Sequence, residues 1–203
     1  MSARPAQQAD SGSGRHEIAE AYRSLRSTVK FATGERPIHS VLVVDVDRDQ
    51  RSGVAEHLAT AFAEAGDRCV LIDTDARTDS DRSAGFFDLL RGSEATVLQA
   101  ASGPLTRIGP GQAASPDALA GDAFSVALDR LIETHGFAIF SSAPLPQFAD
   151  ALAIAPRVDA VILVVTAGGT RRPRAIDARD ALERVGARIL GVVMVEPKKR
   201  WFW

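Results

Sequence analysis

The chain has 203 residues, of which 45% are hydrophobic and 25% are charged, a composition that fits one globular domain with a buried core. Its 24 basic and 26 acidic side chains give a formal net charge of -2, which provides no global field for binding nucleic acid. Sixteen glycines and ten prolines occur without a period, which excludes a collagen-like chain, and no apolar run reaches the length of a membrane span.

The chain begins with a polar stretch followed by a periodic one. Residues 1–15 are rich in Gln, Ser, Gly and Ala and are predicted to form a disordered tail, because they bury too little apolar surface to offset the entropy of ordering. From His16 to Thr33 apolar side chains recur at helical spacing, and Gly34 and Pro37 follow as stop signals. This stretch therefore predicts a first helix.

The remaining sequence alternates short apolar runs with helical stretches. Strands are predicted over residues 40–44, 69–72, 105–108, 137–140, 160–165 and 189–195, and helices over residues 54–65, about 123–134, 149–155 and 173–185. Near-continuous apolar strands separated by helices predict an α/β fold with a doubly wound, mostly parallel sheet and helices on both faces. Ligands of such folds bind at the carboxyl ends of the strands, so the loops after Val44, Ile72, Phe140 and Val165 are the candidate sites.

No metal or disulfide framework is predicted. Cys69 is the one cysteine and lies in an apolar run, which indicates a buried side chain and suits a reducing compartment. The four histidines show no metal-ligand spacing. Asp45, Asp47, Asp49 and Glu56 have the spacing of a calcium loop, but Gln50 stands where such a loop requires glycine.

Four segments together resemble the cytoplasmic P-loop domain of bacterial tyrosine kinases (BY-kinases) of the polysaccharide co-polymerase type. They are the E-x-x-R-x-x-R element in residues 20–27, the L-I-D-x-D-x-R strand end in residues 71–77, the G-L-x-D-x-L-x-G turn in residues 85–92 and the D-A-x-x-x-A-x-x-x-D-x-V stretch in residues 150–161. The resemblance covers nearly everything from Glu20 to Val195, so residues 16–195 are predicted to form a P-loop NTPase-like domain.

The phosphate-binding motif of that family is altered here. Its G-x-G-K-S-T loop falls on residues 48–53, where both glycines are lost, Arg51 stands at the lysine position and Ser52 is retained. A phosphate nest needs backbone conformations that glycine adopts at little cost, and Arg is a poor substitute for Lys because its fork is bulkier. Asp45 and Asp47 would also place carboxylates close to a triphosphate and repel it.

The metal and base positions differ as well, although one acidic motif remains. Ser141 stands where the resemblance implies a magnesium-positioning aspartate, and Val195 where it implies a base-reading asparagine. Asp73 and Asp75 are retained; they are interpreted as caps of neighbouring amides, with a residual metal or nucleotide role as the alternative. Arg51, Ser52, Asp73 and Asp75 are thus predicted to be a vestigial nucleotide site without catalytic residues, and no cofactor is expected.

Two further segments are candidates for contacts with other molecules. Glu20, Arg23 and Arg26 occupy one helix face, and the resemblance implies that this element joins subunits of a ring; a solvated charged face is the alternative. The basic and aromatic segment of residues 196–203 suits a partner or a peripheral membrane contact, with packing onto the domain's own surface as the alternative. Its docking residues are predicted to be Lys198, Lys199, Arg200, Trp201, Phe202 and Trp203.

The functional prediction follows from these alterations. The sole tyrosine is Tyr22, so the chain lacks the tail tyrosines that such kinases phosphorylate. We expect a non-catalytic, pseudokinase-like partner or regulator of a separate membrane chain-length-regulator protein in exopolysaccharide or capsule biosynthesis, cytoplasmic and at the inner membrane face. The alternatives are an active tyrosine kinase or ATPase that uses ATP and magnesium with an atypical phosphate loop, and a positioning ATPase of the ParA and MinD kind.

Overall fold

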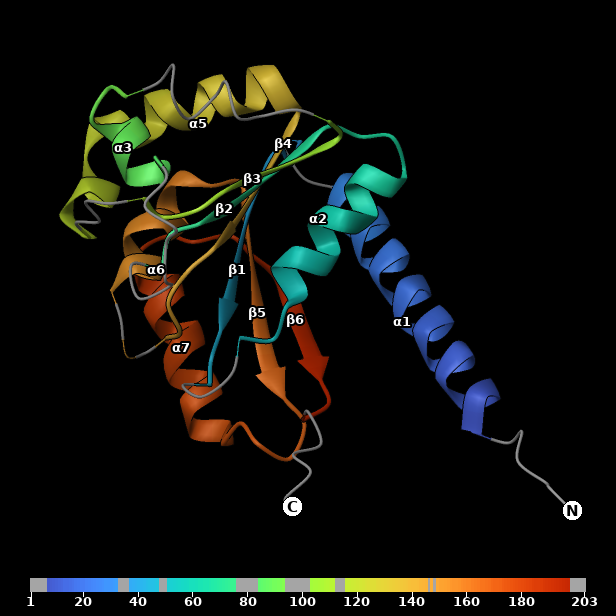
Figure 1. Cartoon of the computed structure of the whole chain (residues 1–203). Helices are drawn as coiled ribbons and strands as arrows, with labels where there is room; N and C mark the ends of the chain where they lie inside the picture. Colours follow the sequence, from blue (N-terminus) through green and yellow to red (C-terminus); the bar gives the residue numbers. More distant parts are fainter. Residues whose placement is uncertain are drawn as a thin grey trace, which may run out of the picture.

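The computed structural model describes residues 7–32, 37–47, 51–75, 84–93, 103–111, 116–145, 147 and 149–197. Six strands form one sheet in the order β3-β2-β4-β1-β5-β6, and every pairing is parallel (Figure 1). The strands are β1 (Ser40–Asp45), β2 (Cys69–Asp73), β3 (Leu105–Ile108), β4 (Phe137–Ser141), β5 (Ala160–Thr166) and β6 (Ile189–Val195). The predicted doubly wound α/β fold is confirmed.

Helices cover both faces of the sheet. α1 (Gln7–Lys30) and α2 (Val54–Glu64) lie on one face, and α3 (Phe86–Leu90), α5 (Asp122–His135), α6 (Asp150–Ile154) and α7 (Arg172–Arg184) lie on the other. Two short 3₁₀ segments, η1 (Pro116–Ala120) and η2 (Ala155–Arg157), complete the described elements. Within the described residues no helix combines the length and the apolar character that a membrane span requires.

The core follows the two-residue period of the strands. In β1, Val41 and Val43 pack with α2, whereas Leu42 and Val44 pack with the helices of the opposite face. Opposite α2, the fully buried rings of Phe86, Phe124 and Phe140 lie with centroids 5.4–5.6 Å apart. Burial of each such ring stabilises the fold by roughly 1.5–3 kcal/mol. Cys69 is also fully buried, as its apolar run predicted.

The first helix is longer than the sequence indicated. α1 begins at Gln7, nine residues before His16, so residues 7–15, which were predicted to belong to a disordered tail, are helical in the structure. Between Pro5 and Pro37 no proline interrupts the backbone hydrogen bonding, and Ala and Gln are good helix formers. The prediction rested on the small apolar surface of these residues, and the two glycines among them, Gly12 and Gly14, each cost a helix only about 1 kcal/mol.

A single carboxylate fixes the start of β1. Asp159 Oδ2 accepts hydrogen bonds from the backbone nitrogens of His39 (2.9 Å) and Ser40 (2.8 Å) and from Ser40 Oγ (2.8 Å). Asp159 directly precedes β5, the neighbour of β1 in the sheet. This aspartate, which the sequence marked only as part of a motif, therefore holds two adjacent strands in register.

Candidate functional site

Three neighbouring strands end in polar side chains at one edge of the sheet. Asp45 is the last residue of β1, Asp73 of β2 and Ser141 of β4, and the sheet order places β4 between the other two. Asp73 and Ser141 are direct partners in the β2–β4 register. Because the strands are parallel, their carboxyl ends lie together at the position where ligands of doubly wound folds bind.

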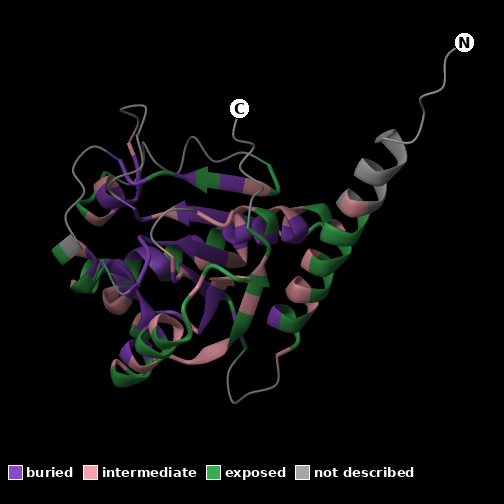
Figure 2. Cartoon of the chain, turned by 90° about the horizontal axis from the view of Figure 1, so that it is seen from below, coloured by how far each residue is buried: buried purple, intermediate pink, exposed green. Residues whose placement is uncertain are grey.

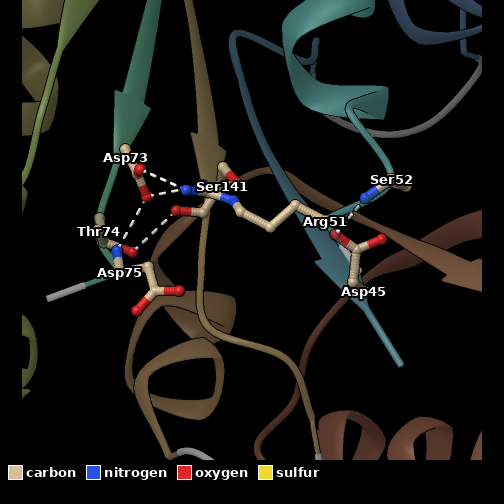
Figure 3. Close-up of polar contacts among 7 residues, drawn as sticks. All are labelled: Asp45, Arg51, Ser52, Asp73, Thr74, Asp75 and Ser141. Carbon is tan, nitrogen blue, oxygen red and sulfur yellow. Dashed lines mark hydrogen bonds and ion pairs between the residues drawn. The ribbon is translucent and has the colours of Figure 1, made fainter. Parts of the chain in front are cut away.

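Arg51 reaches from the segment before α2 across this edge and joins two of the strands. Its Nη1 donates to Asp73 Oδ2 at 2.6 Å, and its Nη2 donates to Asp73 Oδ1 at 2.8 Å and to Ser141 Oγ at 2.7 Å (Figure 3). The two bonds to Asp73 form a bidentate guanidinium–carboxylate pair, the strongest geometry for such an interaction. We call the group of Arg51, Asp73 and Ser141 the Arg51 clasp.

The clasp is partly shielded from water. The exposed fractions of the Arg51 and Asp73 side chains are 34% and 19%. Burial by itself lowers the pKa of the Arg51 guanidinium, but the hydrogen bonds and the charge of Asp73 outweigh burial, so that this pKa is raised. Arg51 is therefore a permanent cation whose charge is already matched by a carboxylate of its own chain.

Ser52 is also engaged within the chain. Its backbone nitrogen donates to Asp45 Oδ2 at 3.2 Å (Figure 3). Its Oγ accepts from Val54 N at 3.2 Å at the start of α2. Burial raises the pKa of the Asp45 carboxyl, and the hydrogen bonds from Ser52 and the charge of Arg51 oppose this rise only in part. A backbone amide that would be available to an anion thus points at a carboxylate instead.

The two retained aspartates have different surroundings. Asp73 Oδ1, besides binding Arg51, accepts from Asp75 N at 3.0 Å, which holds the chain as it leaves β2. Asp75 is buried, with only 3% of its surface exposed. Between them, Thr74 donates to Ser141 O from its nitrogen (2.9 Å) and its Oγ1 (3.1 Å), so β2 and β4 remain joined beyond their last paired residues.

These residues do not fit a nucleotide triphosphate with magnesium. The only cation from the altered phosphate motif in the described residues is paired with Asp73, and the Ser52 amide is bound to Asp45. At the end of β4, Ser141 carries a hydroxyl, which brings no negative charge to attract a metal ion. Among the described residues no three His, Cys, Asp or Glu side chains are grouped so as to hold a metal ion. Residues 48–50 of the motif lie outside the described residues.

The predicted interface residues separate into an exposed pair and a packed residue. Arg23 Nη1 lies 3.2 Å from Glu20 Oε1, and both side chains are about half exposed, at 47% and 58%. Arg26 turns toward its own domain, where its Nη1 donates to Ala61 O of α2 at 3.2 Å. The helix face from Glu20 to Arg26 therefore presents Glu20 and Arg23 outward, whereas Arg26 fastens α1 to α2.

The other predicted docking residues lie outside the described residues. These are Lys198, Lys199, Arg200, Trp201, Phe202 and Trp203, which follow the last described residue, Pro197. Their docking stays a prediction.

Sequence reasoning missed how the site residues bind one another. It placed Arg51, Ser52 and Asp73 at one edge of the sheet, but it treated Ser141 only as a lost carboxylate and Asp45 only as a repulsive charge. The available signal was the type of residue at the strand ends. When a serine and an aspartate end adjacent parallel strands and an arginine lies opposite them, the arginine bonds to both and no ligand is needed. Thr170 and Asp47, which also hydrogen bond to each other, were not anticipated.

Comparison with known proteins finds sequence relatives of this chain. No family model matches the chain. Its sequence is 25% identical over 189 residues to the tyrosine-protein kinase YwqD of Bacillus subtilis, covering 87% of this chain and 80% of the relative, and 24% identical over 192 residues to the putative tyrosine-protein kinase CapB of Staphylococcus aureus, covering 87% and 83%.

Solved structures agree with the sequence relatives. The chimerical protein CapA2B2 superposes with a TM-score of 0.77 at 23% identity, covering 86% of this chain and 83% of the chimera. The kinase domain of the Escherichia coli tyrosine kinase ETK also gives 0.77, at 21% identity, with 91% and 78% covered. The MinC:MinD complex of Aquifex aeolicus gives 0.58 at 13% identity, with 80% and 70% covered.

The sheet order and the two helical layers define an α/β protein of the P-loop NTPase-like class. Within that class the chain is a homologue of the bacterial tyrosine-protein kinases of the CpsD and CapB kind, as its sequence motifs indicated.

Proposed function

We propose that this protein is a non-catalytic, pseudokinase-like cytoplasmic partner or regulator of a membrane polysaccharide co-polymerase in exopolysaccharide or capsule biosynthesis and export. The observation that supports the proposal is the Arg51 clasp, in which Arg51 binds Asp73 and Ser141 at 2.6–2.8 Å. The cation at the phosphate-motif lysine position serves to hold strands β2 and β4 rather than to receive phosphate.

Electrostatics supports the same conclusion. For ATP to bind through Arg51, the guanidinium must leave Asp73, and the freed carboxylate would then face the incoming phosphates. Like charges a few ångströms apart repel by roughly 1 kcal/mol in bulk water and by more near protein. Asp45 adds a second carboxylate beside the Ser52 amide. The described residues of this site therefore disfavour polyphosphate at each of the groups that would have to bind it.

The partner is inferred from the resemblance to kinases of the polysaccharide co-polymerase type. In this proposal a separate membrane chain-length-regulator protein binds the domain, and copies of the domain associate with each other through the outward-facing Glu20 and Arg23. In this proposal the chain contributes binding surfaces and no phosphoryl transfer. Its sole tyrosine, Tyr22, lies half-buried within α1, so the chain offers no tail tyrosine for autophosphorylation.

Equilibrium ATP binding tests the proposal. The protein is titrated with ATP, with and without magnesium, beside the ETK kinase domain as a positive control. We expect no saturable binding at micromolar ATP. An Arg51→Lys variant, which keeps a cation there, should also fail to bind, because the Ser52 amide remains on Asp45. Micromolar, magnesium-dependent binding by the native chain would instead support an active kinase or ATPase.

A cellular test addresses function without catalysis. Arg51→Ala should leave polysaccharide yield nearly unchanged, provided that immunoblotting shows normal protein levels, because the proposed role needs the binding surfaces alone. A matched control is Arg107→Ala, which removes an exposed arginine from β3. Loss of polysaccharide at normal protein level in Arg51→Ala alone would contradict the proposal.

Assembly is tested by reversing one charge. Arg23→Glu places two acidic groups on the outward face of α1 and should lower the mass measured by light scattering. Arg26 is left intact in this variant because it binds α2. Arg172→Glu makes the same charge change at an exposed position of α7 and should leave the mass unchanged. Equal masses for all three proteins would remove the interface from the proposal.

A further inference from the structure

A groove runs between α1 and the edge strand β6, and we call it the α1–β6 groove. It encloses about 620 Å³ and is lined from α1 by Ile18, Tyr22 and Leu25 and from β6 by Val193, Met194 and Val195. A cavity of this size is in the range that proteins use to bind an apolar group. The stacked rings of Tyr22 and His57, 4.9 Å apart, form one wall of it.

The groove is apolar but uncovered. Ile18 and Met194 are 54% and 70% exposed, although both are large apolar side chains that face this space. β6 is the last strand of the sheet, and the N-terminal half of α1 extends away from the body of the domain (Figures 1 and 2). Apolar side chains that line a groove beside an open strand edge mark a surface that binds another segment.

An acidic side chain lies in the lining of the groove. Glu196 lines it directly, one residue beyond the end of β6. Burial raises the pKa of the Tyr22 hydroxyl in the groove wall, and the nearby negative charges of Glu56 and Asp45 raise this pKa further. An occupant that joins aromatic side chains to basic ones is therefore complementary to the groove.

The segment that follows Pro197 has this composition and this position. It reads Lys-Lys-Arg-Trp-Phe-Trp over residues 198–203, and it leaves the domain two residues after Val195, which itself lines the groove. Six residues extend at most roughly 20 Å. The groove wall from Ile18 to Thr28 of α1 is about 15 Å long at 1.5 Å per residue. The segment is thus long enough to reach along the groove.

We propose that residues 198–203 occupy the α1–β6 groove of their own chain, with the aromatic rings of Trp201, Phe202 and Trp203 against Ile18, Leu25 and Met194 and the basic residues beside Glu196. Aromatic side chains of this kind bury 150–250 Å² each. In the free protein the segment then covers apolar surface that is otherwise exposed. A partner that binds the segment must draw it out of the groove, and a partner that binds the groove must displace the segment. This inference does not depend on the loss of nucleotide binding.

Tryptophan fluorescence tests the inference directly, because Trp201 and Trp203 are the only tryptophans in the chain. In the full-length protein we expect emission that is blue-shifted and protected from acrylamide relative to a synthetic peptide of residues 196–203. Met194→Glu and Ile18→Glu should each shift the emission toward that of the peptide. Val126→Glu is the matched control, since Val126 is 52% exposed on α5 and lies outside the groove.

The possible results separate the occupants. The proposal is overturned if the emission of the full-length protein equals that of the peptide. It is also overturned if both groove variants, shown to be folded by circular dichroism, retain the blue shift. If the blue shift disappears on dilution and the mass measured by light scattering falls with it, the segment occupies the groove of a second copy. If the blue shift arises only when anionic lipid vesicles are added, the segment binds a membrane. A blue shift that is independent of concentration, lost in Met194→Glu and retained in Val126→Glu confirms docking within one chain.

Discussion

The Arg51 clasp and the α1–β6 groove adjoin at Ser52, which bonds to Asp45 beside the clasp and also lines the groove. In the clasp, charged groups that are unfavourable when left alone are paired with one another inside the chain. In the groove, apolar side chains such as Met194 remain exposed. The contrast teaches that the charged groups at the carboxyl ends of the strands bind one another, whereas the exposed apolar surface lies beside them.

The largest effect is expected from breaking the clasp. Asp73→Ala leaves the Arg51 guanidinium without its carboxylate and should lower the free energy of unfolding by about 1–3 kcal/mol, measured by urea denaturation. Asp177→Ala, at an exposed position of α7, is the control and should change stability by at most about 0.5 kcal/mol. Equal effects from the two changes would show that the clasp is a loose surface contact and would end the contrast with the groove.

A smaller effect is expected where only one hydrogen bond of the clasp is removed. Ser141→Ala deletes the hydroxyl that accepts from Arg51 at 2.7 Å but leaves the bidentate pair with Asp73 in place. The free energy of unfolding should fall by about 0.5–1.5 kcal/mol. Ser93→Ala, in an exposed turn after α3, serves as the comparison and should have no measurable effect. A loss as large as that of Asp73→Ala would place the main strength of the clasp in the hydroxyl.

Asp45 gives a pH-dependent test of the polar region. Burial raises the pKa of this carboxyl above its ordinary value of 3.8, so its protonated form favours folding. That stabilisation is present below the ordinary pKa and is lost as the pH rises through the higher pKa of the folded state. Asp45→Asn is neutral at every pH and keeps an oxygen to accept from Ser52, so at pH 7 it should be as stable as the native protein or a few tenths of a kcal/mol more stable.

The stabilities of the native protein and Asp45→Asn should converge as the solution is acidified below about pH 4. Urea denaturation over the acidic range measures this. If instead Asp45→Asn is less stable than the native protein at pH 7 and the difference in stability shrinks in acid, the ionised carboxylate stabilises the fold. Burial is then not the dominant influence on the pKa of Asp45.

The smallest effect concerns the core on the sheet face that α1 and α2 cover. Burial raises the pKa of the Cys69 thiol to about 12, so it holds almost no thiolate at pH 8 and should resist alkylation in the native state. Met194→Glu and Ile18→Glu should leave the alkylation rate unchanged, because they alter a surface groove and not the core. Faster alkylation in these variants would show that the groove is continuous with the core and is not a separate binding surface.

The fold was largely predictable because its signals are local. The apolar runs from Ser40 and Cys69 became β1 and β2, and each predicted strand matches an observed one to within one or two residues at its ends. α3 and η1 were not predicted, since five residues are too few to show a helical period. The start of α1 was misplaced because a polar stretch with little apolar surface was expected to be disordered, although nothing in it interrupts a helix.

The site was predictable in position but not in bonding. The parallel sheet sets which residues meet, so Arg51, Ser52 and Asp73 were expected at one edge. Which of these residues hydrogen bond to one another depends on the length of each side chain and on which other polar groups lie within its reach, as with Arg51 and Ser141. The α1–β6 groove was not predicted, because the angle at which α1 leaves the sheet is fixed by contacts such as that of Arg26 with Ala61, which leave no periodic signal.

The carboxylate of Asp159 has a consequence for biosynthesis. It hydrogen bonds to Ser40, which lies 119 residues earlier in the chain. The two strands that pair with β1 are β4 and β5, and both come later in the chain. At 5–20 residues per second, the ribosome takes roughly 6–24 s to deliver Asp159 after Ser40. β1 has no native neighbour until β4 has been synthesised, and it keeps one open edge until β5 follows, so a nascent chain arrested before Asp159 should depend on chaperones more strongly than one released at full length.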